Sequence, residues 1–375
     1  MKERKIKVCY VISSLCSEGP VNILYGLLLN MDYRIFSVSI ITFNPEKKNS
    51  KMADFKKLPV QIIQLAERSP VGFFRMYWGI KKILRTINPD IIHGNCPGSM
   101  LLIPLMLCKC KKVFTPHNFP GKYIRLIYGL KKGIIVQLIT KVMINFYDKV
   151  TCCSESVLEA YNRPNDSRFI AIPNGTSVPL WNRNEREKNM LRDEFGMEKN
   201  IKYFIYVGRF ASGKNIPILA NVFDKIEEDD LKIIMLGTGP LFESVKAMNS
   251  KNIILPGFSK RVHDYLKAAD YYISLSDSEG MPNTLLENMS VGNPVLLSDI
   301  PAHREFLKNF KSEEVGFVVN QNNVEDVRRK IKEIVSCDTN VVAEKMQKVF
   351  LTKYTSKVMS ESYQKVYMSL LDILN

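Results

Sequence analysis

Hydrophobic positions follow two alternating patterns along the whole chain. Short runs rich in Val, Ile, Phe and Tyr are separated by longer segments in which apolar residues recur every three or four positions. Short apolar runs are typical of strands buried on both faces of a parallel sheet, and the spaced segments are typical of the helices that cover such a sheet. The pattern therefore predicts a doubly wound α/β architecture.

The expected strands fall into two groups, separated by turn-forming residues at 173–175 and a polar stretch at 182–189. The first group covers 6–13, 36–43, 60–65, 91–93, 113–115, 150–153 and 169–172, and the second covers 203–207, 232–236, 253–255, 271–275, 295–298 and 317–319. Helices such as 21–29 and 73–86 are expected between them. The interruption predicts a domain junction near 173–182.

Two Rossmann-like domains and a C-terminal helix account for this division. The chain has 375 residues, which suffices for two hydrophobic cores. We expect an N-terminal domain over 1–175 and a second domain over 176–355. Residues after 340 carry no strand pattern and predict helices over 341–351 and 356–374, so that 356–375 packs back on the first domain. Two such domains predict a central cleft, with ligands at the carboxyl ends of the strands.

Charge is distributed unequally between the two halves. The net charge is +15, with 26 Lys and Arg against 11 Asp and Glu in 1–175 but 27 against 27 in 176–375. A one-sided positive field attracts a polyanion, either nucleic acid or an anionic lipid surface, although a generally basic proteome gives the same count. Hydrophobic residues at 46% exclude a disordered chain.

The chain lacks an apolar run long enough to span a bilayer. The longest run, 100–108, is far shorter than the ~18 to 20 residues required, so any membrane contact is expected to be peripheral. The N-terminal basic and apolar residues predict a first strand, not a signal peptide. The eight cysteines lie mostly in apolar runs without regular spacing, which predicts reduced thiols, a cytoplasmic location and no structural metal site.

The segment 276–287 concentrates groups that bind sugars and phosphates. It leaves an expected strand and enters a helix near Asn283, which places Glu279 in the turn and Glu287 about one turn into the helix. A carboxylate accepts hydrogen bonds from a vicinal diol, and the free N–H groups at a helix start hold phosphate. The loop therefore offers sites for sugar, diphosphate and ribose. Taken alone, both acids are equally well explained as solvated residues at a helix end.

A second strand-to-helix connection carries two cations. Arg209 and Lys214 follow the strand 203–207 and could neutralise a diphosphate as it departs, although a single surface cation is commonplace. Glycines follow the neighbouring strands at Gly237-Thr238-Gly239 and at Gly257, where they allow a ligand to approach the backbone.

Read in order, these motifs resemble those of the retaining glycosyltransferases of family 4, which have the GT-B fold. The matching elements are Gly-Arg-x4-Lys-Asn, Leu-Gly-x-Gly-Pro, Gly-Phe, Glu-x7-Glu and Gly-Asn-Pro-Val, between Tyr203 and about Glu305. The N-terminal half matches more loosely through a Gly-containing first loop, Asp90-Ile-Ile-His, Thr115-Pro-His-Asn and Ile172-Pro-Asn-Gly. The first loop has Gly19 alone where the family often has a Gly pair.

The resemblance implies a role for each matching residue. Arg209 and Lys214 would bind the diphosphate, Glu279 the donor-sugar hydroxyls and Glu287 the ribose, while His117 would face the transferring sugar. The implied catalytic residues are His117, Arg209, Lys214 and Glu279. The implied donor site comprises Gly19, Gly208, Arg209, Lys214, Gly257, Phe258, Glu279, Gly280, Met281, Pro282, Asn283, Thr284 and Glu287. Of the other histidines, His93 fits either role, and His263 and His303 are expected to be structural or exposed.

The implied activity is that of a hexosyltransferase-like enzyme. It would move a sugar from a nucleoside-diphosphate sugar, with UDP-sugar favoured, to a hydroxyl of a glycan or polyprenyl-diphosphate-linked acceptor in bacterial surface polysaccharide biosynthesis. No Asp-x-Asp motif is present, so protein cations are expected to replace a metal ion, and no prosthetic group is expected. Retention of anomeric configuration is the family's expectation.

A long helical pattern over 122–148 suggests how the first domain meets its acceptor. Apolar residues cover most of this segment beside a narrow stripe that includes Lys122, Arg125, Lys132 and Lys141. It is either a core helix or a surface that contacts anionic lipid at the inner face of the plasma membrane.

Two other functions remain open. A sugar-nucleotide epimerase or hydrolase on the same scaffold would turn over its donor without an acceptor. A nucleic-acid-binding protein would use the basic half, but aromatic-interleaved basic motifs are absent, so nucleic acid is not an expected partner.

Overall fold

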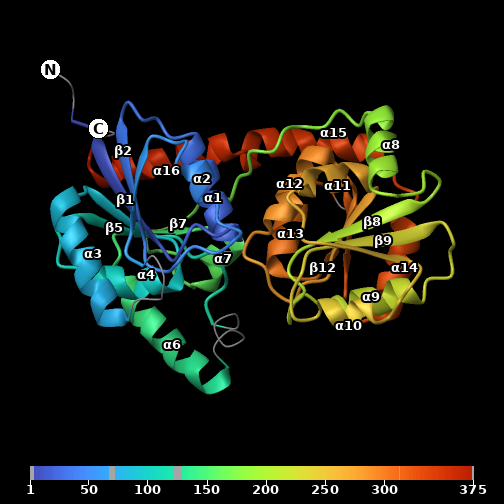
Figure 1. Ribbon diagram of the computed structural model, residues 1–375, viewed down its shortest axis with the longest axis horizontal. Coiled ribbons are helices and arrows are strands. Elements are labelled where there is room, and N and C mark those ends of the chain that lie inside the picture. The colour runs from blue at the N-terminus through green and yellow to red at the C-terminus, as the bar shows by residue number, and fades with distance from the viewer. Residues whose placement is uncertain (1–3, 67–71, 122–128, 312, 374–375) are drawn as a thin grey trace. The chain divides into compact units, whose positions relative to one another are not determined.

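The computed structural model describes residues 4–66, 72–121, 129–311 and 313–373 (Figure 1). The described chain forms two compact units. Unit 1 contains the residues up to Ser177 together with those from Thr355 onward, and unit 2 is Val178–Tyr354.

Unit 1 is built on a parallel seven-stranded sheet in the order β3-β2-β1-β4-β5-β6-β7. The strands are β1 (Ile6–Ile12), β2 (Phe36–Thr42), β3 (Val60–Gln64), β4 (Ile91–Gly94), β5 (Lys111–Phe114), β6 (Lys149–Cys152) and β7 (Phe169–Ala171). In the register of the central strands, Val8 lies opposite Val38 of β2 and Ile91 of β4. The inner strands are buried, which explains their continuous apolar sequence.

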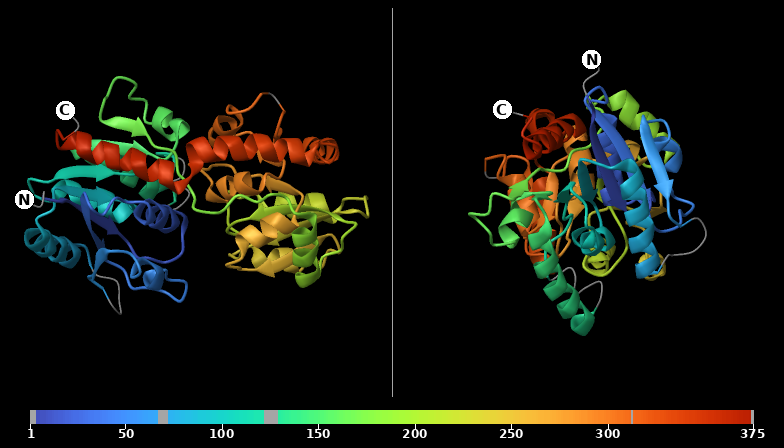
Figure 2. Two further views of the ribbon diagram at one scale, coloured as in Figure 1. Left: turned by 90° about the horizontal axis from the view of Figure 1, so that it is seen from above. Right: turned by 90° about the vertical axis from the view of Figure 1, so that its left-hand side faces the viewer.

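The helices that pack around this sheet come from the N-terminal part of the chain and from its C-terminal end. They are α1 (Gly19–Leu29), α2 (Met52–Phe55), α3 (Phe73–Ile87), α4 (Pro97–Leu102), α6 (Leu130–Met143), α7 (Glu155–Ala160) and α16 (Ser356–Leu370), with 3-10 turns at Ile103–Leu105 and Ile144–Phe146. Although α16 is the last helix of the chain, it packs against α1 of unit 1 (red in Figure 2).

Hydrogen bonds fix α16 to α1 and to the sheet of unit 1. Ser360 Oγ donates to the Leu27 carbonyl at 2.8 Å. The Tyr367 hydroxyl lies 2.8 Å from the Tyr10 hydroxyl and 2.7 Å from His93 Nδ1, and all three side chains are buried. Buried polar groups cost free energy unless they are paired, so this network specifies where α16 docks.

Unit 2 repeats the architecture with a parallel six-stranded sheet in the order β10-β9-β8-β11-β12-β13. Its strands are β8 (Lys202–Val207), β9 (Leu231–Leu236), β10 (Ile253–Gly257), β11 (Tyr271–Ser274), β12 (Val295–Ser298) and β13 (Gly316–Val319). Its helices are α8 (Glu185–Glu194), α9 (Ile216–Asp224), α10 (Phe242–Lys246), α11 (Val262–Ala268), α12 (Asn283–Val291), α13 (Pro301–Leu307), α14 (Val324–Ile334) and α15 (Thr339–Val349), followed by a π-helical turn at Phe350–Tyr354. The predicted doubly wound parallel architecture is confirmed.

Helix α6 differs from the helix predicted over 122–148. Its described part begins at Leu130 and ends at Met143, because the chain tightens into a 3-10 turn at Ile144–Phe146. Lys122 and Arg125 of the predicted basic stripe lie outside the described residues. Figures 1 and 2 show α6 extending away from the sheet of its own unit.

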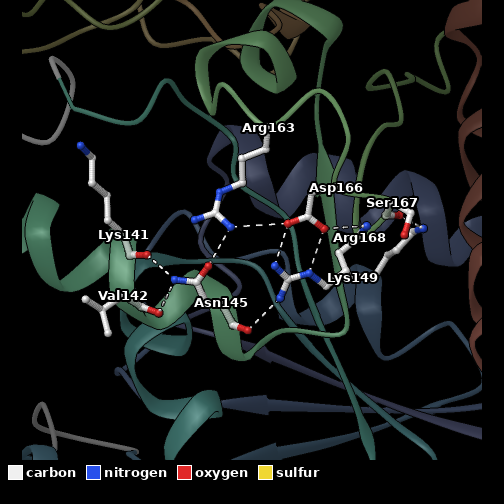
Figure 3. Close-up of polar contacts among 8 residues, drawn as sticks. All are labelled: Lys141, Val142, Asn145, Lys149, Arg163, Asp166, Ser167 and Arg168. Carbon is white, nitrogen blue, oxygen red and sulfur yellow. Dashed lines mark hydrogen bonds and ion pairs between the residues drawn. The ribbon is translucent and has the colours of Figure 1, made fainter.

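A polar cluster fastens the C-terminal end of α6 to the loop between α7 and β7 (Figure 3). Arg163 and Arg168 both pair with Asp166. Arg163 donates to Asn145 Oδ1 at 2.7 Å, and Arg168 donates to the Asn145 carbonyl at 2.9 Å. Asn145 in turn donates to the Lys141 carbonyl at 2.9 Å. Helix α6 is therefore held firmly at one end.

The prediction that every cysteine is reduced is wrong for one pair. Cys108 and Cys110 form a disulfide, with Cα atoms 5.3 Å apart, a separation within the usual range for such bonds. A bend at the single intervening residue brings the two side chains together. The prediction considered only cysteines with the regular spacing of a disulfide framework, and this pair lacks it. The remaining cysteines are free thiols. Among the described helices, none has the length and apolar character needed to cross a bilayer.

Candidate functional site

The strand order of the sheet in unit 2 reverses between β8 and β11. Connections from β8 run to β9 and β10 on one side, whereas β11 leads to β12 and β13 on the other. In open parallel sheets the two loops that leave such a point diverge and form a crevice for ligand at the carboxyl edge. Here those loops are 208–215, which follows β8, and 275–282, which follows β11.

Lys214 and Glu279 meet at this point. Lys214 Nζ forms an ion pair with Glu279 Oε1, although the two residues are far apart in the sequence. Ser276 Oγ donates a second hydrogen bond to the same carboxylate oxygen at 2.7 Å. The side chains are 28% and 16% exposed, so the pair is shielded from bulk water yet open to a ligand.

The surroundings keep Glu279 ionised. Burial alone would raise the pKa of this carboxyl, but the charge of Lys214 and the hydrogen bonds from Lys214 and Ser276 outweigh that effect. The pKa of Glu279 is therefore lowered below its ordinary value. At neutral pH the site presents a carboxylate, which is an acceptor for hydroxyl groups and not a proton donor.

Asn215 locks the two loops together. Its Nδ2 donates to the Leu275 carbonyl at 2.8 Å and to Asp277 Oδ1 at 2.7 Å, and Asp277 N donates to the Gly213 carbonyl at 2.9 Å. Asn215 has φ of 52°, a left-handed conformation that Asn tolerates better than most residues. Asn215 is the last residue of the Gly-Arg-x4-Lys-Asn motif, and no role was predicted for it from the sequence.

Glycines allow the adjoining strand ends to pack closely. Gly237 has φ of 140°, and a Cβ added there would lie 1.9 Å from the Gly208 carbonyl oxygen. Gly208 N donates to Leu236 O at 3.0 Å, and Gly237 N donates to Gly257 O at 2.8 Å. Gly208 and Gly257 thus belong to one continuous edge, beside which Phe258 is exposed.

Helix α12 begins at Asn283, as predicted, and its start lies directly after the loop that carries Glu279. Gly280, Met281 and Pro282 are buried. Thr284 is tied to β8 and β11, because its hydroxyl lies 2.9 Å from the Tyr272 hydroxyl and donates to the Val207 carbonyl at 3.5 Å.

The position of α12 turns its positive end toward the same edge of the sheet. Glu287 is half-buried in α12 about one turn from Asn283. Backbone N–H groups at a helix start attract anions such as phosphate. The geometry therefore combines an anion-attracting helix end with a cation and a carboxylate.

Arg209 does not join the Lys214–Glu279 contact. Its side chain is exposed, and its guanidinium makes no hydrogen bond or ion pair within the described structure. Its backbone is fixed, because the Tyr206 hydroxyl donates to the Arg209 carbonyl at 3.1 Å. A long exposed side chain on a fixed backbone remains available to a ligand at this edge.

The predicted site residues of unit 1 follow the carboxyl ends of two strands. Gly19 opens α1 after β1, and His117 follows β5. His117 is half-buried, and its Nε2 is shielded from solvent without a hydrogen-bond partner among the described residues. Burial lowers the pKa of His117 to about 4, so the ring is neutral at physiological pH.

The other histidines lie in three different environments. His93 is fully buried in the network beneath α16, where its Nε2 lies 2.8 Å from Thr115 Oγ1. His263 is half-buried with Nε2 3.0 Å from Ser290 Oγ. His303 is fully buried beside the loop that carries Glu279. This proximity was not predicted, because the sequence does not reveal which strands pair with one another. No group of three or more potential metal ligands occurs among the residues described.

Comparisons with known proteins agree on the family. The profile "Glycosyl transferases group 1" matches residues 187–350, and "Glycosyltransferase Family 4" matches residues 18–178. The alpha-monoglucosyldiacylglycerol synthase of Streptococcus pneumoniae is 28% identical over 64% of this chain, and the match spans 58% of that relative's length. The O-antigen biosynthesis glycosyltransferase WclY of Escherichia coli is 24% identical over 97% of this chain and 99% of its own.

Solved structures show the fold. Anabaena Alr3699/HepE, crystallised with UDP and glucose, superposes with a TM-score of 0.79 at 14% identity, covering 97% of this chain and 100% of that chain. The two units therefore have the GT-B fold. Within that class, the chain belongs to the family 4 glycosyltransferases.

Proposed function

We propose that this glycosyltransferase is a retaining enzyme that uses a nucleoside-diphosphate sugar, with UDP-sugar favoured. The observation that carries the proposal is the contact of Lys214 with Glu279 where β8 and β11 diverge. That point unites a cation for diphosphate, a carboxylate for sugar hydroxyls and the start of α12. Solved structures of similar fold in complex with UDP and with UDP-glucose favour a uridine donor.

Stabilisation of the leaving group is the main demand of the reaction. As the bond from the anomeric carbon to the diphosphate breaks, negative charge builds up on the phosphate oxygens. Lys214, Arg209 and the N–H groups of α12 are proposed to stabilise that charge without a metal ion. Asn215 holds the loop that carries Lys214, and Thr284 holds the start of α12, so these two groups need little reorganisation when the bond breaks.

Glu279 and Glu287 are proposed to hold the two sugars of the donor. Glu279, kept ionised by Lys214, accepts hydrogen bonds from hydroxyls of the transferred sugar, and Glu287 accepts them from the ribose. His117 is proposed to contact the transferring sugar as a neutral imidazole, since burial keeps its pKa near 4. Its Nε2 has no hydrogen-bond partner within the described parts of the chain, which supports this role, because such atoms are rare in folded proteins unless a ligand completes them.

The proposed acceptor is a hydroxyl of a glycan or a polyprenyl-diphosphate-linked sugar in bacterial surface polysaccharide synthesis. Relatives named for this chemistry support it, among them WclY and a galactosyltransferase of Escherichia coli named for a diphosphoundecaprenol-linked substrate, 27% identical over 65% of this chain.

The enzyme is proposed to act in the cytoplasm and to bind the inner face of the plasma membrane through unit 1. Helix α6 contains Lys131, Lys132 and Lys141 but no acid. Its exposed apolar residues are Ile134, Ile135, Leu138, Ile139 and Val142. The opposing interpretation, a core helix covered on both sides, fits these exposed side chains poorly. An apolar and basic helix face of this kind suits anionic lipid.

A second helix of unit 1 supports the same partner. In α3, Phe74 and Trp78 are exposed on one face, and Lys82 and Arg85 are exposed on the same helix without an acid among its residues. Aromatic rings flanked by cations are typical of segments that sit at the surface of a bilayer.

A donor screen followed by product analysis tests the proposal. The melting temperature is measured with UDP-, GDP- and ADP-sugars, because a ligand that binds only the folded state raises it. The selected donor is then incubated with and without a lipid-linked glycan acceptor. We expect transfer only with acceptor, an α-linked product from an α-linked donor, and no loss of rate in EDTA. Efficient donor turnover without acceptor would indicate an epimerase or hydrolase instead.

A further inference from the structure

His303 is a buried residue with an unusual environment close to the proposed donor site. It lies in the first turn of α13 and has no exposed surface. Its Nδ1 lies 3.0 Å from the Ser298 carbonyl oxygen and 3.1 Å from Ser298 Oγ. A carbonyl only accepts hydrogen bonds, so Nδ1 carries the proton of the neutral ring and Nε2 is left as an acceptor. Nε2 is buried and has no partner within the described structure.

Hydrogen bonds continue from this histidine to Glu279. Ser298 Oγ donates to the Ser276 carbonyl at 2.6 Å, and Ser276 Oγ donates to Glu279 Oε1 at 2.7 Å. Ser276 and Ser298 are buried, so water does not compete for these bonds. The chain of contacts begins in α13, passes the end of β12, and reaches the carboxylate in the loop after β11.

The electrostatic interactions of His303 also indicate that it lies close to Glu279. Burial lowers the pKa of His303 to about 4, while the charge of Glu279 acts in the opposite direction and that of Lys214 acts in the same direction as burial. The ring is thus neutral under physiological conditions. A leucine would fill a similar volume without leaving a nitrogen unpaired, so packing alone does not account for a histidine here.

We propose that His303 is a positioning residue that holds Glu279 in place through Ser298 and Ser276. This inference rests on the proposed function, in which Glu279 contacts the hydroxyls of the donor sugar. By orienting the Ser298 hydroxyl, the Nδ1–H of His303 fixes the Ser276 backbone, and Ser276 then directs its own hydroxyl at the carboxylate. His303 does not touch the substrate in this role.

The test compares His303→Leu, which removes the Nδ1–H donor, with His303→Asn, whose amide N–H reaches a similar position. Calorimetry measures the affinity of each variant for the nucleotide sugar selected by the donor screen and for the matching free nucleoside diphosphate. We expect His303→Leu to weaken nucleotide-sugar binding about 10-fold, a coupling of the size found within one hydrogen-bond network, and to leave the free diphosphate unaffected. His303→Asn is expected to restore most of the loss.

A double-mutant cycle shows whether the effect passes through Glu279. In a Glu279→Ala background, His303→Leu is expected to cause no further loss. If His303→Leu does not fold, Ser298→Ala removes only one hydroxyl and is expected to give the same pattern.

The proposed positioning of Glu279 by His303 through Ser298 and Ser276 is called the relay below. Three results would overturn it. These are no change in nucleotide-sugar affinity on His303→Leu, an equal loss for both ligands, and an undiminished loss in the Glu279→Ala background. The proposed function fails separately if Glu279→Ala itself binds the nucleotide sugar as well as the unmodified enzyme, and the relay then fails with it. A weakened Glu279→Ala beside an unaffected His303→Leu would reject the relay alone.

Discussion

Lys214 and Glu279 form an ion pair between the loops that leave β8 and β11, and Ser276 adds a hydrogen bond to the same carboxylate oxygen. The pair places opposite charges side by side at the point of the six-stranded sheet where the strand order reverses. A nucleotide sugar carries groups that suit both charges, since its diphosphate is anionic and its sugar hydroxyls are hydrogen-bond donors. Several consequences can be measured.

Replacing Lys214 by Ala should lower kcat about 100- to 1,000-fold, by analogy with the removal of one fixed donor that stabilises charge in a transition state. Lys251→Ala is the matched control, because Lys251 also pairs with a carboxylate in unit 2 but is largely exposed at the surface. Initial rates of sugar transfer under saturating donor provide the measurement. Turnover close to normal in Lys214→Ala would exclude this lysine from the mechanism.

Donor binding should weaken at low pH, and Lys214→Ala should move that loss to higher pH. Glu279 binds hydroxyls as a carboxylate, and its pKa is lowered because the nearby Lys214 charge and hydrogen bonds overcome burial. The lowered pKa contributes stability above the ordinary carboxyl pKa, and this contribution disappears as pH falls through the folded-state pKa. Without Lys214, the carboxyl becomes protonated at higher pH.

Calorimetric titration of the nucleotide sugar between pH 3 and 8 follows this change in both proteins. The free nucleoside diphosphate is the control ligand, since Glu279 is not proposed to contact it. An acid limb that stays at the same pH in Lys214→Ala argues against control of Glu279 by Lys214.

Asp270 should be essential for the stability of unit 2. It accepts from Lys188 at 2.5 Å, from Arg192 at 2.6 Å and from the Tyr203 backbone at 2.7 Å, and both cations are at least nine-tenths buried. Asp270→Ala leaves two buried cations unpaired and should cost about 3 to 5 kcal/mol in the free energy of unfolding. Asp229→Ala, which breaks a pair exposed to solvent, should change the free energy of unfolding little. Urea denaturation monitors both, and equal losses would refute the prediction.

Exposed apolar residues of α6 should control binding to anionic membranes. Ile135 and Leu138 are each 58% exposed, so Ile135→Ser with Leu138→Ser should leave the fold intact and reduce flotation with vesicles that contain anionic phospholipid. Leu351→Ser in unit 2, with similar exposure, is the matched control. Lys131→Gln with Lys132→Gln should weaken binding further and reduce its sensitivity to salt. Unchanged flotation in all α6 variants would count against membrane contact through this helix.

The strands and the fold class were predictable because their signal is local. A strand buried on both faces needs a continuous apolar run, and runs such as 36–43 and 203–207 differ from the observed β2 and β8 only at their ends. The charges at Lys214 and Glu279 were also visible, since both follow strands and parallel strands end at the same edge.

The relay from His303 was not predictable, because it depends on which strands are neighbours. His303 and Ser298 belong to the β12–α13 connection, whereas Ser276 and Glu279 follow β11, and only the pairing of β11 with β12 brings them together. The exposure of α6 was hidden for a related reason. An apolar helix sequence does not reveal whether protein or another surface covers it.

The most direct test of the central claim is a crystal structure with the nucleoside diphosphate of the preferred donor. The account predicts that the diphosphate lies at the start of α12, with its oxygens bonded to Lys214 Nζ and close to Arg209, while Glu279 remains beside the position of the transferred sugar. A nucleotide bound with its diphosphate away from Lys214 and α12 would contradict the account.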